Sequence, residues 1–378
     1  MNRALLVVLL ASGCHFVIDP DSVPLPGLGG LAAGDGHTCT CAVAQGGVQC
    51  WGADYYGQLG DGFATDSYVP LQVVGLTTGV QAITAGTGHT CALVNGGGHC
   101  WGDNSFGQLG DNSVMEGRHP VQVSGLTTGV QAISAGGGHT CALVNGGVQC
   151  WGFNSGGQLG DDSMTDRHLP VEVSGLTTGV QGISAGGYHT CALVNGAVQC
   201  WGANDDGQLG NNSMVASAVP VQVSGLTTGV QAISASGDHT CALVNGGVLC
   251  WGANNFGQLG NNSMAASAVP VVVSGPTTGV QAISAGNSHT CALVNGGVWC
   301  WGRGSSGQLG NNSLDDHAEP VQVSRLATGV QAISAGSNHT CALAYGAFQC
   351  WGANHTGQLG NNSQRDSLVP VPVSPPRL

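Results

Sequence analysis

Cysteine residues nine positions apart recur seven times in this 378-residue sequence. Together with a histidine two residues earlier, such a pair (His139, Cys141 and Cys150) offers ligands that zinc prefers. The alternative is a disulfide, which the intervening turn favours. Asn145-Gly146 is typical of a type I′ hairpin turn, because both central residues need positive φ. Folding the chain there places the two cysteines opposite each other at a non-hydrogen-bonded position, where Cα atoms lie about 4.5 Å apart. This distance allows a disulfide, so we predict one.

The same arrangement predicts one disulfide in every repeat and leaves one cysteine of the repeats, Cys39, without a partner in this scheme. Each bridge closes a short loop and is expected to contribute about 2 kcal/mol of stability. Cys39 is either a free thiol or an alternative partner for Cys50. Sixteen regularly spaced cysteines favour an oxidising compartment. The predicted pairs are Cys41–Cys50, Cys91–Cys100, Cys141–Cys150, Cys191–Cys200, Cys241–Cys250, Cys291–Cys300 and Cys341–Cys350.

The hairpins belong to a repeat with a fixed period. Seven tryptophans, from Trp51 to Trp351, are spaced by 50 residues without insertion or deletion. Each unit contains four short strand patterns, none with a helical period, so we predict an all-β, seven-bladed β-propeller with four short antiparallel strands per blade. The small-residue segment Val130–Gly136 is expected innermost and His119–Ser124 outermost. Val369–Ser374 is expected either in the last blade or laced onto the first.

Regions outside the repeats suggest export. Residues 1–14 are typical of a signal peptide, and the sequence ending in Cys14 resembles a bacterial lipobox, in which that cysteine carries a lipid. The alternative is an ordinary secretory signal with an unmodified Cys14. Residues 15–27 are interpreted as a Pro-rich tether, 28–375 as the propeller and 376–378 as a tail. The protein is therefore expected in the cell envelope or secreted, with membrane contact only through that lipid.

Composition and motifs exclude several functions. The net charge is −13 and all seven basic residues are arginine, so no basic patch favours nucleic-acid binding. No catalytic constellation breaks the sevenfold pattern, so we expect no enzyme, cofactor or metal. The histidine that recurs once per repeat could form a metal-binding or pH-responsive ring. The favoured interpretation is a hydrogen bond to the backbone of the neighbouring blade.

The segments Trp251–Gly260 and Ala285–Thr290 are similar to the repeat of the regulator of chromosome condensation family. The resemblance covers about residues 28–375 and suggests an exported, bacterial-type member. It implies a seven-bladed propeller with a central channel and loops on two faces. Members of the family include a nucleotide exchange factor for a nuclear GTPase and a secreted inhibitor of β-lactamases, so the fold alone fixes no function.

Residues that break the repeat indicate where binding occurs. They concentrate in three loops, following Trp-Gly, preceding the outer-strand proline, and preceding His-Thr. We predict a monomeric, non-catalytic scaffold that binds protein or glycan through these loops. The alternatives are inhibition of a secreted hydrolase and, by resemblance only, nucleotide exchange. The candidate binding residues are Tyr55, Tyr56, Phe106, Tyr188, Phe256 and Arg303.

Overall fold

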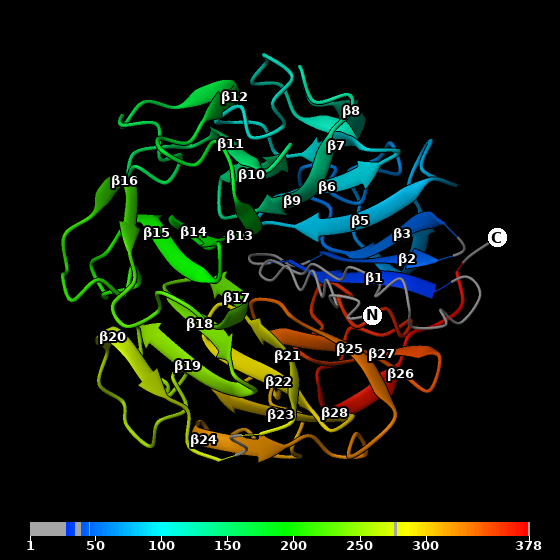
Figure 1. The fold of residues 1–378 in the computed structure, drawn as a ribbon. Helices are drawn as coiled ribbons and strands as arrows, with labels where there is room; N and C mark the ends of the chain where they lie inside the picture. Colours follow the sequence, from blue (N-terminus) through cyan, green and yellow to red (C-terminus); the bar gives the residue numbers. More distant parts are fainter. Residues whose placement is uncertain (1–27, 35–38, 45, 276–277, 377–378) are drawn as a thin grey trace, which may run out of the picture.

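The computed structural model describes residues 28–34, 39–44, 46–275 and 278–376. The proposed signal peptide, Cys14, the tether and His37 lie outside this part of the chain. The described residues form seven four-stranded antiparallel sheets arranged around a central axis, without a helix among them (Figure 1). The predicted all-β, seven-bladed propeller is confirmed.

Each sheet is one blade and consists of four strands that are consecutive in the sequence. The strands of blades 1 to 4 are β1 (Leu28–Ala33), β2 (Cys39–Ala44), β3 (Gly47–Gly52), β4 (Ser67–Gln72); β5 (Val80–Ala85), β6 (His89–Val94), β7 (Gly97–Gly102), β8 (Gly117–Gln122); β9 (Val130–Ala135), β10 (His139–Val144), β11 (Gly147–Gly152), β12 (Arg167–Glu172); β13 (Val180–Ala185), β14 (His189–Val194), β15 (Ala197–Gly202) and β16 (Ser217–Gln222). Those of blades 5 to 7 are β17 (Val230–Ser236), β18 (His239–Val244), β19 (Gly247–Gly252), β20 (Ser267–Val272); β21 (Val280–Ala285), β22 (His289–Val294), β23 (Gly297–Gly302), β24 (His317–Gln322); β25 (Val330–Ala335), β26 (His339–Ala344), β27 (Ala347–Gly352) and β28 (Ser367–Pro372).

The hairpin between β10 and β11 has the predicted register. Cys141 lies opposite Cys150, and the turn residues Asn145 and Gly146 have φ angles of 52° and 82°. All seven disulfides are present, with Cα–Cα distances of 4.0–4.1 Å. Since Cys50 bonds to Cys41, the alternative bridge from Cys39 to Cys50 is wrong. The side chain of Cys39 lies outside the described part of the structure.

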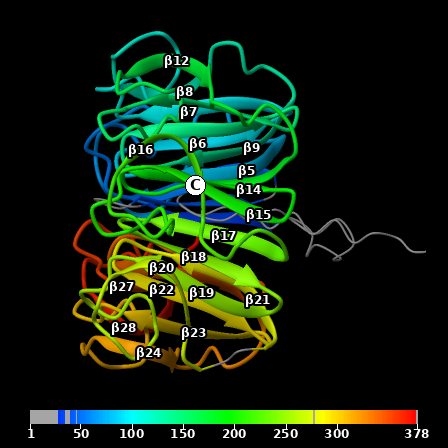
Figure 2. The ribbon, with the colours of Figure 1, turned by 60° about the vertical axis from the view of Figure 1, so that its left-hand side comes forward.

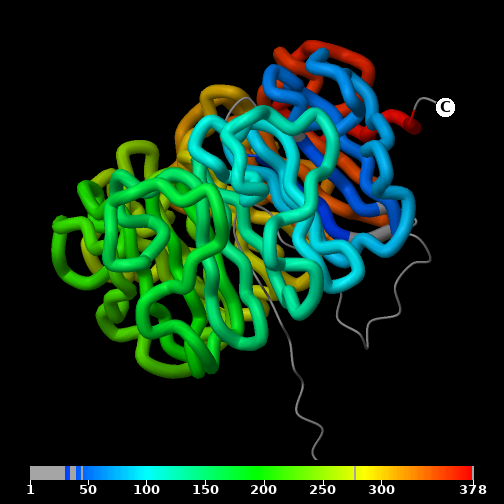
Figure 3. Tube along the Cα trace, turned by 90° about the horizontal axis from the view of Figure 1, so that it is seen from above, coloured from blue at the N-terminus to red at the C-terminus, as the bar shows by residue number. Residues whose placement is uncertain are grey.

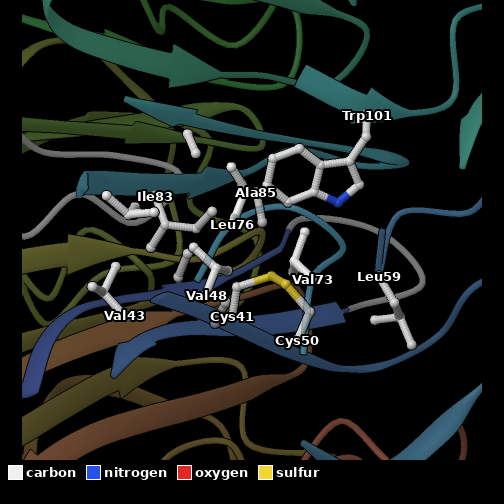
Figure 4. Packing of buried hydrophobic residues seen from close by; sticks show 14 residues of the cluster. Cys41, Val43, Val48, Cys50, Leu59, Val73, Leu76, Ile83, Ala85 and Trp101 are labelled. Atoms are coloured by element: carbon white, nitrogen blue, oxygen red, sulfur yellow. A yellow bond between two sulfur atoms is a disulfide. The ribbon is translucent and has the colours of Figure 1, made fainter. Parts of the chain in front are cut away.

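Each disulfide packs in the core between two blades. In Figure 4 the Cys41–Cys50 bridge of blade 1 lies near Val48 and Val73, in a cluster that also contains Trp101 of blade 2. Both sulfurs belong to fully buried residues. The bridge therefore stiffens the hairpin against which the next blade packs.

The outer strands begin and end two residues earlier than predicted. β8 covers Gly117–Gln122 rather than 119–124, because Val123 leaves the strand ladder and donates its N–H to the carbonyl of Gly98. A register shift next to Pro120 removes the need for a ladder N–H at the proline. β28 pairs with β27 and therefore belongs to the last blade.

A hydrogen-bond relay that begins at a histidine joins neighbouring blades at six of the seven junctions within the described residues. His139 Nε2 of blade 3 lies 2.9 Å from Thr190 Oγ1 of blade 4, and that hydroxyl donates to the carbonyl of Gln158 in blade 3. Trp201 Nε1 donates to the same carbonyl. The expectation that the histidine bonds to the backbone of the neighbouring blade is wrong, because its Nε2 bonds to a threonine side chain of that blade instead. Since the threonine proton is used, Nε2 must donate, and the histidine is the neutral Nε2–H tautomer.

The ring closes without a shared strand. The first and last blades lie side by side (Figure 3), and their junction repeats the relay of the five other junctions whose histidine the structure describes. His339 Nε2 lies 2.8 Å from Thr40 Oγ1, and both Thr40 and Trp51 donate to the carbonyl of Gln358 at 3.0 Å. The last junction is therefore held by the same contacts as those within the chain.

Asp54 replaces, in blade 1, the asparagine that organises the loop in most blades. Its Oδ1 accepts the N–H of Leu59, as Asn104 does for Leu109, and its Oδ2 accepts the N–H of Thr65. Burial, only partly offset by these bonds, raises the pKa of Asp54 to about 7. The folded chain therefore keeps this proton to a higher pH than the unfolded chain does.

Asp54→Asn is expected to change how stability depends on pH. Between pH 4 and pH 7 the unfolded wild type has released the Asp54 proton while the folded protein still holds it, so the contribution of Asp54 to stability falls as pH rises. The asparagine variant lacks this loss. Chemical denaturation should show that the free energy of unfolding of the variant, relative to that of the wild type, increases by about 2–3 kcal/mol from pH 4 to pH 7. Above pH 7 this difference should become constant. A difference independent of pH would contradict the assignment.

Candidate functional site

The antiparallel order of each blade separates its connections onto two opposite faces, visible at either side of the disc in Figure 2. One face, the variable face, carries the loops between the first and second strands and between the third and fourth. The other, the repeated face, carries the Asn-Gly hairpin turns and the connections to the next blade. All six candidate binding residues belong to loops of the variable face.

Three loop positions meet at each junction of the variable face. They are the fifth residue after the repeat tryptophan, the second residue after the tryptophan of the next blade, and the residue preceding that blade's histidine. At the junction of blades 2 and 3 these are Phe106, Phe153 and Gly138, and a Cβ on the glycine would contact both aromatic residues. The choice of side chains at these positions sets the chemistry of each junction.

Aromatic residues cluster across blades 2 to 4. The ring centroids of Phe106 and Phe153 are 4.6 Å apart, and those of Phe153 and Tyr188 are 6.0 Å apart with an edge-on arrangement. Tyr188 is 53% exposed and Phe106 is 38% exposed. The cluster therefore presents ring surface to solvent.

The other candidate residues form separate pairs. The rings of Tyr55 and Tyr56 are 6.2 Å apart on blade 1. Arg303 lies over the ring of Phe256, with Cζ 5.0 Å from its centroid. The structure thus joins Phe106 to Tyr188 and Phe256 to Arg303, but shows no single cluster of all six.

Carboxylates flank the aromatic cluster. Asp103 accepts hydrogen bonds from Ser105 and, at 2.8 Å, from Gln108 Nε2. Asp238 has no hydrogen bond to its carboxylate in the described part of the chain. Burial, followed by the charges of Asp206 and Asp205, raises the pKa of Asp238.

The cluster and both carboxylates line a cavity of 410 Å³ on the axis, which we call the axial cavity. Six blades also contribute the same position of the loop between their first and second strands to its wall, namely Thr87, Gly137, Gly187, Gly237, Asn287 and Ser337. Backbone hydrogen bonds tie several of these loops together, as from Gly137 N to Gly186 O and from Gly187 N to Gly237 O. The loops that form the wall are therefore linked to one another by backbone hydrogen bonds, which hold them in a fixed arrangement.

The repeated face offers much less variation. Asn-Gly forms five successive hairpin turns, from Asn95-Gly96 to Asn295-Gly296. In the sequence, Gln45 replaces the asparagine in the first repeat and Tyr345 replaces it in the last. Tyr345 is 66% exposed, and Arg325 replaces a turn glycine nearby in the sequence. Side chains that break the sevenfold pattern thus concentrate on the variable face.

Phe153 was missed from the sequence. The signal for Phe153 was present, since alanine occupies the equivalent position in four of the seven repeats. Among the residues described, no group of three or more His, Cys, Asp or Glu side chains could hold a metal ion. The described part of the chain also contains no helix suited to crossing a membrane.

These features define a disulfide-stapled propeller with one variable face. The family model described as the RCC1-like domain matches residues 99–378, and the model of the Regulator of chromosome condensation (RCC1) repeat matches residues 45–93. Because the first match covers well over half of the chain, the protein belongs to the RCC1-like domain family.

Solved structures share the fold at low sequence identity. Human WBSCR16 is 24% identical, with 86% of this chain and 93% of that chain covered and a TM-score of 0.77. Prp20p from Saccharomyces cerevisiae is 24% identical, with 87% and 86% covered and a TM-score of 0.78. The ectodomain of the receptor kinase CR4 from Physcomitrella patens is 23% identical, with 85% and 72% covered and a TM-score of 0.52. No curated protein matches the chain.

Proposed function

We propose that this protein is a non-catalytic scaffold, exported to the cell envelope, that binds a partner protein through its variable face. One observation carries the proposal: the side chains that break the sevenfold repeat gather on one face of a rigid frame. Loops fixed on a rigid frame are where binding residues usually lie. Exposed aromatic side chains such as Tyr55 and Tyr188 are typical anchors of protein interfaces.

Apolar residues in the longer loops support a protein partner. The fourth residue after the repeated Gln-Leu-Gly is exposed and apolar in five successive blades, in each case between the third and fourth strands. Methionine adapts its shape to a partner surface, and three of the five are methionine. The five residues are Val114, Met164, Met214, Met264 and Leu314.

The described relatives are compatible with this role. The structure report of Prp20p names its binding properties to Gsp1p and histones, so a propeller of this fold can serve protein binding. Export is supported by the seven buried disulfides, which persist in oxidising compartments. Mass spectrometry of the mature protein would test export, by finding cleavage before Cys14 and a lipid on its thiol or cleavage at another site of the signal.

A capture experiment tests the variable face. Wild type and the triple variant Phe106→Ser, Phe153→Ala, Tyr188→Ser would serve as baits in envelope extracts from the cells that produce the protein. Each substituted residue already occupies the equivalent position elsewhere in the chain, at Ser306, Ala203 and Ser288, so the variant is expected to fold. Tyr345→Asn is the matched control on the repeated face, because asparagine stands there in other blades.

The proposal predicts a partner that wild type and Tyr345→Asn capture and the triple variant loses. Protease treatment of the extract should abolish capture, whereas a glycan ligand would survive it. Equal capture by the triple variant, or loss only in Tyr345→Asn, would remove the variable face from the function.

A further inference from the structure

We propose that the axial cavity binds a cationic group, an alkylammonium or guanidinium on a side chain of the partner, between the rings of Phe106, Phe153 and Tyr188 and the carboxylate of Asp238. This inference rests on the proposed function only in placing the cation on a partner protein. The cavity, the rings and the carboxylate define the chemistry of the site independently of who supplies the ligand.

The axial cavity has the size and framing of a binding site. Its volume of 410 Å³ lies within the range of small-ligand pockets and is ample for a lysine or arginine head group. Phe106, Phe153, Tyr188 and Asp238 all line it. Backbone hydrogen bonds between neighbouring loops fix the backbone positions from which these side chains extend.

The aromatic cluster supplies attraction for a positive charge. The faces of aromatic rings carry partial negative charge, and a cation within about 6 Å of a ring centroid is attracted to them. Phe106, Phe153 and Tyr188 form a continuous row through centroid distances of 4.6 and 6.0 Å. Since Phe106 and Tyr188 remain partly exposed, a side chain from outside can reach the row.

Asp238 supplies a charge that the protein leaves uncompensated. Its carboxylate has no hydrogen bond from any residue that the structure describes, and its pKa is raised by burial and by Asp206 and Asp205. Asp103, on the other side of the cluster, differs because Ser105 and Gln108 already bond to it. A cation that enters the cavity would give Asp238 the counter-charge that it lacks.

The chain itself provides a precedent for a cation at this loop position. Phe256 and Arg303 occupy, at the junction of blades 5 and 6, the positions that Phe106 and Phe153 occupy at the junction of blades 2 and 3. There the guanidinium carbon lies 5.0 Å from the ring centroid. Where blade 6 provides its own arginine, blade 3 provides a ring, so the cation must come from another molecule.

Titration with small probes tests the site without the partner. Nα-acetyl-arginine amide and Nα-acetyl-lysine amide would be compared with Nα-acetyl-citrulline amide, a neutral isostere of the arginine probe, using saturation-transfer NMR. We expect both charged probes to bind with millimolar dissociation constants and the citrulline probe at least about tenfold more weakly. Asp238→Asn and Phe153→Ala should each weaken the charged probes by about tenfold, and Tyr345→Asn should not.

The outcomes separate this inference from the proposed function. Equal binding of the arginine and citrulline probes, no binding of any probe, or undiminished binding by Asp238→Asn would each overturn the cation site. Asparagine and alanine occupy the equivalent positions at Asn338 and Ala203, so misfolding of the variants is not expected. If the probes fail while the triple variant still loses its partner, the scaffold function stands and the cation site falls.

Discussion

Acidification from pH 7.5 to pH 5 is expected to remove about 12 kcal/mol of stability through the buried histidines, a loss that the opposite contribution of Asp54 reduces by about 2–3 kcal/mol. Six fully buried histidines of the inter-blade relay are responsible, His89, His139, His189, His239, His289 and His339. Burial lowers the pKa of each to between about 3 and about 4, and at His139, His189 and His289 the charges of neighbouring histidines contribute further. Each donates through Nε2 to a threonine, and its buried Nδ1 has no hydrogen-bond partner among the residues that the structure describes.

The sign follows from proton linkage. In the unfolded chain these imidazoles bind protons near pH 6.5, whereas the folded protein keeps them neutral until about pH 4. Stability is therefore fully present above pH 6.5 and is lost as pH falls toward 4. At pH 5 each histidine lowers the free energy of unfolding by about 2 kcal/mol. The sum over the six histidines is comparable to the whole free energy of unfolding of a typical domain.

Denaturant titrations at a series of pH values would measure this loss. Replacement of one relay histidine, as in His139→Gln, should reduce the number of protons taken up on unfolding by about one. His355→Gln is the matched control, because the His355 side chain is 79% exposed. A free energy of unfolding that stays constant between pH 7.5 and pH 5 would show that the relay histidines are not buried and neutral.

Loss of the disulfides is expected to have a similarly large effect. Each bridge joins cysteines nine residues apart, and the chain-entropy estimate for so short a loop is about 2.6 kcal/mol, or about 18 kcal/mol for all seven. The fully reduced chain should therefore not maintain the ring at 37 °C. Because all fourteen bridged cysteines are fully buried, reductant should act on the native protein only as fast as blades open.

Thiol titration and thermal unfolding test this prediction together. The native protein should expose no thiol from the seven pairs without denaturant, and the denatured and reduced chain should show a markedly lower unfolding temperature after return to native buffer. The double variant Cys141→Ala, Cys150→Ala should lose about 2 kcal/mol or more, since the buried sulfurs also pack against blade 4. Unchanged thermal stability after full reduction would contradict the structural role of the bridges.

Local rules were sufficient to predict the blade. The Asn145-Gly146 turn determines which residues face each other, so the cysteine pairing followed from counting along two strands. The strict spacing of the tryptophans determined the number of blades. The bounds of the outer strand were misplaced by two residues, because neither the register shift beside the proline nor the backbone bond from Val123 to Gly98 could be read from the sequence.

Contacts between blades could not be predicted in the same way. The threonine that receives the His139 bond lies 51 residues away in the sequence, and its role depends on the carbonyl of Gln158 being shared with a tryptophan. The aromatic cluster likewise joins residues from three blades. Phe153 stood out only as a departure from alanine, and its contact with Phe106 required the packed junction.

Site-specific photo-crosslinking tests the central claim, that one face of the propeller binds the partner, most directly. Tyr55 on the variable face and Tyr345 on the repeated face are both exposed tyrosines, at 81% and 66%, and each would be replaced by p-benzoylphenylalanine in the producing cells. The account predicts a protein adduct from position 55 and none from position 345. An adduct only from position 345, or equal adducts from both, would contradict it.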